Sequence, residues 1–367
     1  MFSRKALSLA ITLVLCLAVS ATADSFKTKK RTVTKLADGV YAIRHQDPPN
    51  AFVQGNTLVV IGDREVFVVD STFLPSSARE DIAEIRQWTD KPVRYVLNTH
   101  WHGDHWIGNA EYRNAFPGVV ILAQAKTVEK IAASDPGRLL RIFAVRADRA
   151  RKMLADGKDA GGKPLTPGDI ADLNTIIQGT DAVLAELTPL QARPSDLIPS
   201  MSFDHDVTFD IGNREVQVKF LGRGNTEGDA IAYLPKEKIV ATGDLLDHPI
   251  PYLGGGFPQD QIETLKRIAA LDIHTIVPGH GDPMNNTAFL NMTIDFIQEV
   301  VNTVDKLLYD PVISRSPELM QKAVEERIDV AAWRQKFAGS DPDDQDEFNE
   351  FSLPGVIKAA YYRMWGR

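Results

Sequence analysis

The sequence is organised around one histidine-rich stretch, Asn98 to His105, which reads Asn-Thr-His-Trp-His-Gly-Asp-His. It contains three of the eight histidines of the chain. Imidazole nitrogen and carboxylate oxygen are the donors that borderline divalent metals bind in proteins. A solvated polar loop in which histidines cluster by chance is the alternative, and it leaves the close spacing unexplained. The stretch therefore predicts a metal site.

A short, apolar and partly β-branched segment, Val93 to Leu97, comes directly before this stretch and predicts a buried strand. The histidine-rich residues are therefore expected to leave the end of a strand as a loop. A loop on a rigid scaffold can direct several ligands to one point.

The first residues, Met1 to Ala23, are expected to be a cleavable export signal rather than part of the fold. Arg4 and Lys5 precede an apolar run over Ala6 to Val19, and Ala21-Thr22-Ala23 is a cleavage pattern. The run is shorter than the roughly 18 residues that a membrane-spanning helix needs. The protein is therefore predicted to be periplasmic or secreted, without a stable membrane anchor.

The only cysteine, Cys16, lies inside this apolar run. Leu15 precedes it, where a lipid-anchoring signal has a small residue, so a lipoprotein is not favoured. Residues 24–367 then have no disulfide to form and no thiolate to offer a metal.

The chain is acidic, with a formal net charge of −8, and its charges are scattered along the sequence. This pattern argues against nucleic acid and against an anionic membrane surface as partners, and leaves a small-molecule substrate. The oligomeric state is not indicated.

The first half of the chain predicts antiparallel strands followed by a helix. An Asp38-Gly39 turn between two β-branched runs is a strong hairpin signal. A helix capped by Ser76 or Ser77 is expected to lead into the strand that delivers the metal loop. The predicted strands are Thr32–Leu36, Val40–Arg44, Thr57–Ile61 and Val66–Val69, and the predicted helix is Ser76–Trp88.

Between about residues 123 and 195 the pattern changes to helical periodicity. Three helices are predicted around Leu139–Val145, Ile170–Ile177 and Val183–Leu187, with a loop over Asp156–Gly168. A helical block inside a sheet-forming chain is most simply a cap over the site. A structural buttress on the outer face remains the alternative.

Strands resume after the helical block, and again polar residues follow their ends. One predicted strand ends at Gly243-Asp244 and a later one at Pro278-Gly279-His280. From Thr287 onward the chain predicts helices, and the acidic stretch Asp341–Glu347 is expected to be a solvated segment. The predicted strands are Val207–Asp210, Glu215–Phe220, Ala230–Leu234, Lys238–Ala241 and Ile273–Val277, with a helix over Gln259–Leu271.

The His-x-His-x-Asp-His loop and the two later strand-end motifs resemble the metallo-β-lactamase superfamily, over roughly Val40 to Asp282 without the helical block. The resemblance implies an α/β fold, a four-layer αββα sandwich of two similar halves with the metals at one edge. Residues 24–367 are expected to form one such domain, with the helical insertion at about 123–195 and C-terminal helices at about 287–367.

The resemblance also implies a set of zinc ligands for one or two ions. The first metal position would use His100 and His102, and the second would use Asp104, His105 and His280. Asp244 resembles the carboxylate that bridges two metals in those hydrolases of the superfamily that have it.

One position departs from the family pattern. The superfamily usually has Gly-x-x-His-Thr-x-Gly-Asp after a strand, and the matching residues, Gly222 to Asp229, have Asn225 in place of the histidine. An amide oxygen is a weaker zinc ligand than imidazole. Three interpretations stay open: Asn225 is a weak ligand or supports a ligand in a two-metal site, the protein works with one metal, or it binds without turnover.

Other residues near these motifs have two interpretations each. Trp101 and Trp106 flank the ligands and either wall the pocket or pack in the core. His248 is either a replacement ligand or an ordinary loop residue. His45, His205 and His274 lie outside the motifs and are expected to be structural.

The resemblance implies a zinc hydrolase in which a metal-bound hydroxide attacks an ester, lactone, thioester or related bond, with Asp104 as the residue that orients the water or accepts its proton. A β-lactamase-type amide hydrolase and a non-catalytic metal-binding protein are the alternatives. Lactamases that use a cysteine ligand are excluded, because residues 24–367 have none. Flavodiiron proteins need further domains, and a nuclease does not suit an acidic exported chain.

Overall fold

The structure is a computed structural model that describes residues 30–47 and 53–365. The predicted export signal, Met1–Ala23, lies outside the described residues. Among those that are described, no helix is both long enough and apolar enough to cross a membrane.

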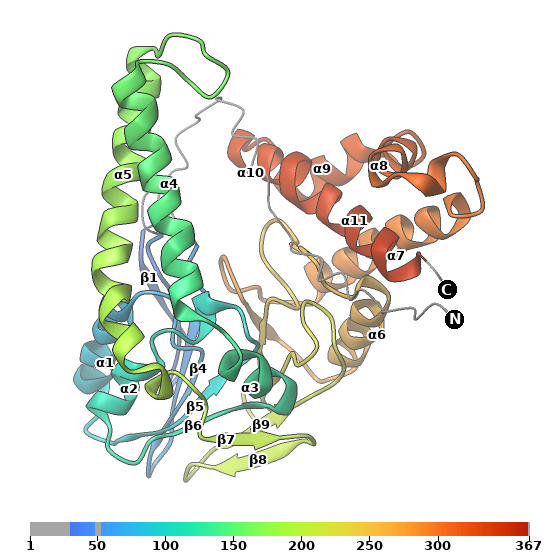
Figure 1. The fold of residues 1–367 in the computed structure, drawn as a ribbon. Helices are drawn as coiled ribbons and strands as arrows, with labels where there is room; N and C mark the ends of the chain where they lie inside the picture. The colour runs from blue at the N-terminus through green and yellow to red at the C-terminus, as the bar shows by residue number, and fades with distance from the viewer. Residues whose placement is uncertain (1–29, 48–52, 366–367) are drawn as a thin grey trace, which may run out of the picture.

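The N-terminal half forms a seven-stranded sheet whose strands follow one another in chain order (Figure 1). The hairpin predicted at Asp38-Gly39 is present, the predicted strands β3 and β4 form a second hairpin, and the metal loop leaves the end of β5 as expected. The three-residue strand β7, which no sequence pattern indicated, pairs with β6 in parallel and closes this sheet. The strands are β1 (Thr32–Ala37), β2 (Val40–Arg44), β3 (Thr57–Ile61), β4 (Val66–Val69), β5 (Val93–Asn98), β6 (Val120–Gln124) and β7 (Met201–Phe203).

The second half forms a five-stranded sheet with the order β12-β11-β10-β9-β8. Four of its strands lie within two residues of their predicted bounds, and β12 begins two residues later than predicted. These strands are β8 (Val207–Asp210), β9 (Glu215–Lys219), β10 (Ile231–Leu234), β11 (Ile239–Gly243) and β12 (Thr275–Pro278).

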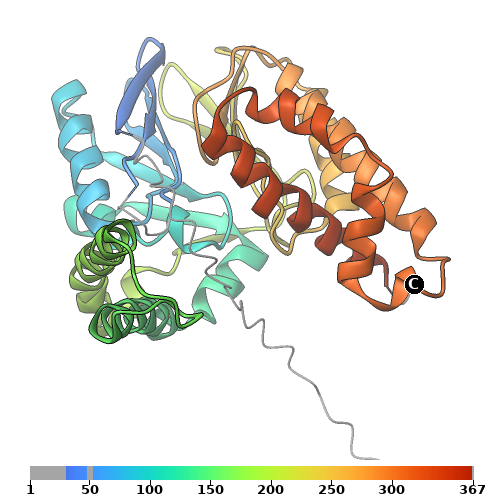
Figure 2. The same cartoon turned by 90° about the horizontal axis from the view of Figure 1, so that it is seen from above.

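Three apolar clusters show that the molecule has four layers. One cluster joins the inner faces of the two sheets, with Leu58 and Val218 among its members. A second lies between the first sheet and α1 (Pro75–Trp88) and α2 (Asn109–Ala115). The third lies between the second sheet and the helices α6 (Pro258–Ala269) and α7 (Ala288–Leu307). Figures 1 and 2 show the two groups of helices on opposite sides of the sheets, as the predicted αββα sandwich requires.

Two sequence-based expectations in the helices are wrong. Helix α1 begins at Pro75 and has no side-chain cap, because the N-cap residue is Leu74. Ser76 lies inside the first turn, where its backbone N–H and hydroxyl donate to Glu186. The segments predicted as two helices around Ile170 and Val183 form one helix, α5 (Pro167–Leu187), which starts at a Thr166–Asp169 capping box.

The helical insertion is a long hairpin of α4 (Pro136–Asp156) and α5, preceded by the short helix α3 (Ala125–Ala132). The hairpin extends beyond the sheets (Figure 1). The helix predicted around Leu139–Val145 is present as part of α4, although Ile142 and Val145 are 49% and 67% exposed. The face that is buried carries Leu140, Phe143, Ala147 and Ala150.

The base of the hairpin packs on the segment that follows the metal loop. Phe143 and Val183 share an apolar cluster with Phe73, Trp106 and Ile107. The hairpin therefore supports this segment from the outside, which matches the buttress interpretation better than the cap.

The chain ends in a group of helices that covers the outer side of the second sheet (Figure 2). The acidic stretch predicted as a solvated segment is the helix α10, and the side chain of Asp341 caps its first turn. The elements after α7 are α8 (Pro317–Glu325), α9 (Val330–Ala338), α10 (Pro342–Glu347), a π-helical turn (Phe348–Ser352) and α11 (Leu353–Met364).

Candidate metal centre

The predicted ligands come from loops at one edge of the two sheets. β4 pairs with β5 in parallel, and β11 pairs with β12 in parallel. The carboxyl ends of parallel neighbours lie at the same edge of a sheet. His100 to His105 follow β5, Asp244 follows β11, and His280 follows β12, so the topology brings the three loops together.

The ligand atoms gather into two groups that share Asp244. Within each group the donor atoms lie within 4.8 Å of one another. The groups are Asp104, His105, Asp244 and His280, and His100, His102 and Asp244. These are the two sets that the family resemblance implied.

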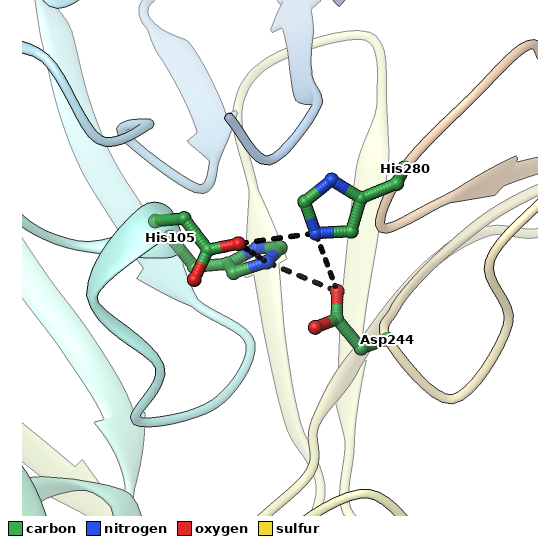
Figure 3. A group of neighbouring side chains, drawn as sticks. His105, Asp244 and His280 are labelled. Carbon is green, nitrogen blue, oxygen red and sulfur yellow. Dashed lines mark ion pairs between the residues drawn. The ribbon is translucent and has the colours of Figure 1, made fainter. Parts of the chain in front are cut away.

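The first group converges on one oxygen of Asp244 (Figure 3). Its Oδ1 lies 3.0 Å from Nε2 of His105 and 3.5 Å from Nε2 of His280. Asp104 completes this group, because its Oδ2 lies 3.1 Å from the same nitrogen of His280.

The second group converges on the other oxygen of Asp244. Its Oδ2 lies 3.1 Å from Nε2 of His100 and 3.8 Å from Nδ1 of His102. The two carboxylate oxygens therefore face different groups of histidines. Asp244 therefore offers one oxygen to each group.

Several buried donors in this centre have no hydrogen-bond partner among the described residues. They are Nε2 of His100, Nε2 of His105, Oδ1 of Asn225 and Oδ1 of Asp244. Leaving a buried polar atom unpaired is costly, and such atoms in a native structure call for an explanation. A metal ion accepts lone pairs from donors of this kind, so the residues present fit a metal centre.

Neighbouring residues fix the ring nitrogens that face this centre. Nδ1 of His105 donates to Oδ2 of Asp70 at 2.8 Å, and Nδ1 of His100 lies 3.1 Å from the hydroxyl of Thr99. Each Nε2 lone pair is then free for a metal. Asp70 also accepts from the backbone N–H and the hydroxyl of Thr99.

Asp70 is a functional residue that the sequence reasoning missed. It stands directly after β4, as Asp244 stands directly after β11, so its place at a strand end was the available signal. Its φ of 59° is in the left-handed region, which aspartate tolerates better than most residues.

The protonation states of the histidines and carboxylates in this centre favour binding of a cation. Burial lowers the pKa of His100 to about 4, so its imidazole is neutral and able to bind a metal. Burial opposes charge on His280 as well, but Asp244 and Asp104 outweigh it and raise the pKa of His280 to about 10. Without a metal, the positive charge of the protonated His280 ring offsets the negative charge of the carboxylates. A divalent ion displaces such a proton when it binds.

Asn225 is 3% exposed and lies beside the second group. Its Nδ2 is 3.3 Å from Nδ1 of His102 and 3.4 Å from Oδ2 of Asp244. A half-turn of the amide exchanges its nitrogen and oxygen, which would direct Oδ1 to the same point. Asp229 holds this loop by accepting from Gly224 and Thr226.

The two tryptophans have different positions. Trp101 is half-buried, packs its ring edge-on to His102 at 4.7 Å, and donates from Nε1 to Glu227. Trp106 is buried in the cluster beneath the hairpin, and its Nε1 donates to the backbone carbonyl of Trp101, a position that agrees with packing in the core. The ring of His248 packs on Phe289, and this histidine belongs to neither donor group.

A second buried carboxyl, Asp247, lies near the centre and was also missed. Burial and the charge of Asp244 raise its pKa well above the ordinary value. Its Oδ1 has no hydrogen-bond partner among the described residues. No strand-end motif marks it, because it lies inside the loop that follows Asp244.

The chain belongs to the metallo-β-lactamase superfamily: residues 50–280 match that family, whose members are mostly hydrolases. A metallo-β-lactamase from Pontibacter korlensis has a similar fold, with a TM-score of 0.51 and 20% identity. That similarity covers 73% of this chain and 99% of the Pontibacter chain.

Two curated relatives are similar over shorter segments. A type 2 metallo-β-lactamase from Elizabethkingia meningoseptica is 26% identical over 126 residues, which are 33% of this chain and 47% of that protein. A hydroxyacylglutathione hydrolase from Gloeobacter violaceus is 30% identical over 115 residues, 28% of this chain and 44% of that protein. The chain thus spans less than half the length of either relative.

Proposed function

We propose that this protein is a zinc-dependent hydrolase that cleaves an ester, lactone, thioester or related bond. One observation carries the proposal: the two oxygens of Asp244 face two separate groups of histidines. A single carboxylate placed in this way could contribute to two metal positions, one at each group. Two-metal centres of this kind stabilise both the attacking and the leaving oxygen during hydrolysis.

The donor set supports zinc in particular. Imidazole nitrogen with carboxylate oxygen is a common zinc ligand set. His100, His102 and Asp244 would hold one ion, and Asp104, His105, His280 and Asp244 the other. Zinc bound there would supply a hydroxide nucleophile at neutral pH, because it lowers the pKa of water from ~16 to ~7, and would polarise the substrate carbonyl.

Asp104 is the side chain that we expect to transfer protons during hydrolysis. Burial opposes the charge of Asp104, but His105 and His280 outweigh it and keep the pKa of Asp104 below its ordinary value. Asp104 is therefore ionised and can accept a proton from the attacking water. As the acyl bond to oxygen or sulfur breaks, Asp104 would pass that proton to the departing atom.

The substrate class is proposed from the bridging carboxylate. Asp244 is typical of the ester, lactone, thioester and phosphoester hydrolases of the superfamily, and residues 24–367 contain no cysteine ligand. The relative named as a hydroxyacylglutathione hydrolase is consistent with an acyl substrate. We propose export to the periplasm or medium as well, on the strength of the pattern in Met1–Ala23.

The test combines metal analysis with a substrate panel. The purified protein should contain one or two equivalents of zinc. It should also hydrolyse at least one of an aryl ester, a lactone and an acyl thioester, and Asp104→Ala should abolish that activity. Asp272→Ala is the matched control, because the side chain of Asp272 is exposed and pairs with Lys238.

Two results would contradict the proposal. Hydrolysis of a chromogenic cephalosporin alone would move the protein to the β-lactamase-type amide hydrolases. Full zinc content without turnover of any probe above the metal-free control would indicate a binding protein.

A further inference from the structure

Two consecutive residues, Gly55 and Asn56, lie between the loop after β5 and the turn after β12. They stand directly before β3, in the first half of the fold. The backbone N–H of Gly55 donates to the carbonyl of Asp104 at 3.2 Å, and that of Asn56 donates to the carbonyl of Gly279 at 2.7 Å. One short segment therefore contacts both the loop that carries Asp104 and the turn that carries His280.

The side chain of Asn56 binds the turn that carries His280 on both sides of this histidine. Its Nδ2 donates to the carbonyl of Pro278 at 2.9 Å and to the carbonyl of Gly281 at 2.8 Å. An amide nitrogen has two N–H groups, so one side chain can serve both carbonyls. Asn56 is 6% exposed, and its bonds to the turn are therefore shielded from water.

The two carbonyls determine the orientation of this amide. A carbonyl oxygen only accepts, so the nitrogen of Asn56 must face Pro278 and Gly281. The Oδ1 of Asn56 is buried and has no hydrogen-bond partner among the described residues, which is costly. Leucine has nearly the same shape and would carry no unpaired acceptor. What asparagine adds at this position is therefore its two donors.

His280 needs such support more than His105 and His100 do. The Nδ1 of His105 is held by Asp70, and that of His100 lies beside the hydroxyl of Thr99. In the part of the chain that the structure describes, no residue forms a hydrogen bond with Nδ1 of His280. This histidine also lies outside any helix or strand. The direction of its ring therefore depends on the backbone of the turn (Figure 3).

The second half of the fold holds the same turn from its other side. The N–H of Gly279 donates to the carbonyl of Gly243 at 3.0 Å, and the N–H of His248 donates to the carbonyl of His280 at 3.0 Å. Asn56 ties the turn to the first half, whose loop after β5 completes this metal position. The side chain of Asn56 thus joins ligand segments from the two halves of the molecule.

We propose that Asn56 is a positioning residue of the metal centre. It holds the turn of His280 against the loop of Asp104 and His105, and so assembles this metal position before an ion binds. The inference rests on the metal centre of the proposed function and not on its substrate. Ligands that are already assembled lose less conformational freedom on binding, which increases affinity. The first ion is therefore expected to bind at this position.

The experiment titrates the metal-free protein with Co²⁺ alone, whose visible absorption reports the ligands and geometry of the bound ion. Asn56→Leu keeps the shape of the side chain and removes both donors. It should weaken binding of the first cobalt equivalent about 10- to 100-fold and change its absorption. Asn174→Leu is the matched control, because Nδ2 of Asn174 also donates to a backbone carbonyl, that of Ile170, at an exposed site on α5.

A double-mutant cycle tests whether Asn56 acts through His280. In a protein that already carries His280→Ala, Asn56→Leu should change the cobalt affinity less than about twofold, whereas a role in general stability would add its full effect. Ile297→Ala, in the cluster beneath α7, is the control for lost stability and should leave the cobalt absorption unchanged. Asn56→Ala removes the same donors with a smaller side chain, and gives a second measurement if leucine disturbs folding.

Two outcomes would overturn the inference alone. They are an unchanged cobalt affinity and absorption in both Asn56 variants, and a loss of affinity that is fully additive with His280→Ala. A wild type that binds cobalt but cleaves no probe contradicts only the proposed activity. A wild type that binds no cobalt contradicts both the inference and the metal centre.

Discussion

The Nδ1 of His105 donates to Oδ2 of Asp70 at 2.8 Å, and both side chains are buried. Asp70 stands at the end of β4 and His105 in the loop after β5, so this bond ties two neighbouring strand ends together. It also sets the tautomer of His105, which leaves Nε2 directed at Asp244. The position of one metal group thus depends on a residue that binds no metal itself.

Replacement of Asp70 by asparagine should weaken metal binding. The amide oxygen cannot accept from both His105 and Thr99 as the carboxylate does, and the amide N–H groups would oppose these donors. We expect about a 10- to 100-fold loss in affinity for the tighter metal, measured by titration of the metal-free protein. Asp63→Asn, at an exposed position before β4, should leave affinity unchanged, and equal affinity in the two variants would contradict this role.

Gly55 should tolerate no side chain. A β-carbon there would lie 2.5 Å from Cε1 of His105 and 2.9 Å from the carbonyl oxygen of Asp104, and the latter is a backbone atom that cannot turn away. Gly55→Ala should therefore lower metal affinity and cost about 1–3 kcal/mol of stability, measured by denaturant unfolding. Gly168→Ala is the control, because its nearest neighbour would be 3.6 Å away. A Gly55→Ala protein with wild-type affinity would show that the ligand loop can move.

Much of the architecture could be predicted from the sequence because local patterns determine it. The Asp38-Gly39 turn fixed the first hairpin, and β-branched runs placed β3, β4 and β5. The position of the ligands after strands followed from the same patterns. Parallel pairing of β11 with β12 then brings Asp244 and His280 to one edge.

The remaining features depend on contacts between distant segments. Asp70 has no motif, and its role exists only because β4 lies beside β5. Strand β7 is too short to show a period, and it is stabilised by pairing with β6. Trp106 follows the ligands in sequence but packs beneath the hairpin, because its loop turns into α2.

Asn225→His should strengthen the second metal group. Asn225 lies 3.3 Å from His102 and 3.4 Å from Asp244, where an imidazole nitrogen could complete a set of three histidines. The variant should bind the second zinc equivalent at least tenfold more tightly than the wild type, as measured by competition with a chelator. Unchanged stoichiometry and affinity would mean that this position does not limit binding of the metal at His100 and His102.

Removal of metal should lower thermal stability. Asp104 and Asp244 are two carboxylates in one buried centre, and a bound cation relieves their repulsion. Metal at 100 times its Kd stabilises by about 2.7 kcal/mol, which for a chain of this size corresponds to a fall of roughly 4 °C in Tm on chelation. Scanning calorimetry with and without chelator measures this difference, and addition of zinc should restore it. An identical Tm in both states would argue against a metal centre.

The helical hairpin should affect stability and metal binding through the buried residues at its base, and not through its exposed face. Phe143 is 1% exposed, and its ring centre lies 6.0 Å from the ring centre of Phe73. Both residues belong to the apolar cluster that contains Trp106. Phe143→Ala should cost about 3–5 kcal/mol and weaken metal binding, because the cavity loosens the segment behind the ligand loop.

Val145, on the same helix, is 67% exposed, so Val145→Ala should leave stability, metal affinity and KM near their wild-type values. A hairpin that closes over bound substrate would instead use this exposed face, and Val145→Ala or Ile142→Ala would then raise KM at unchanged stability. Denaturant unfolding, metal titration and steady-state kinetics on the three variants distinguish a buttress from a cap. The buried stripe of α4 faces α5 and Phe73, and for that reason we expect the buttress.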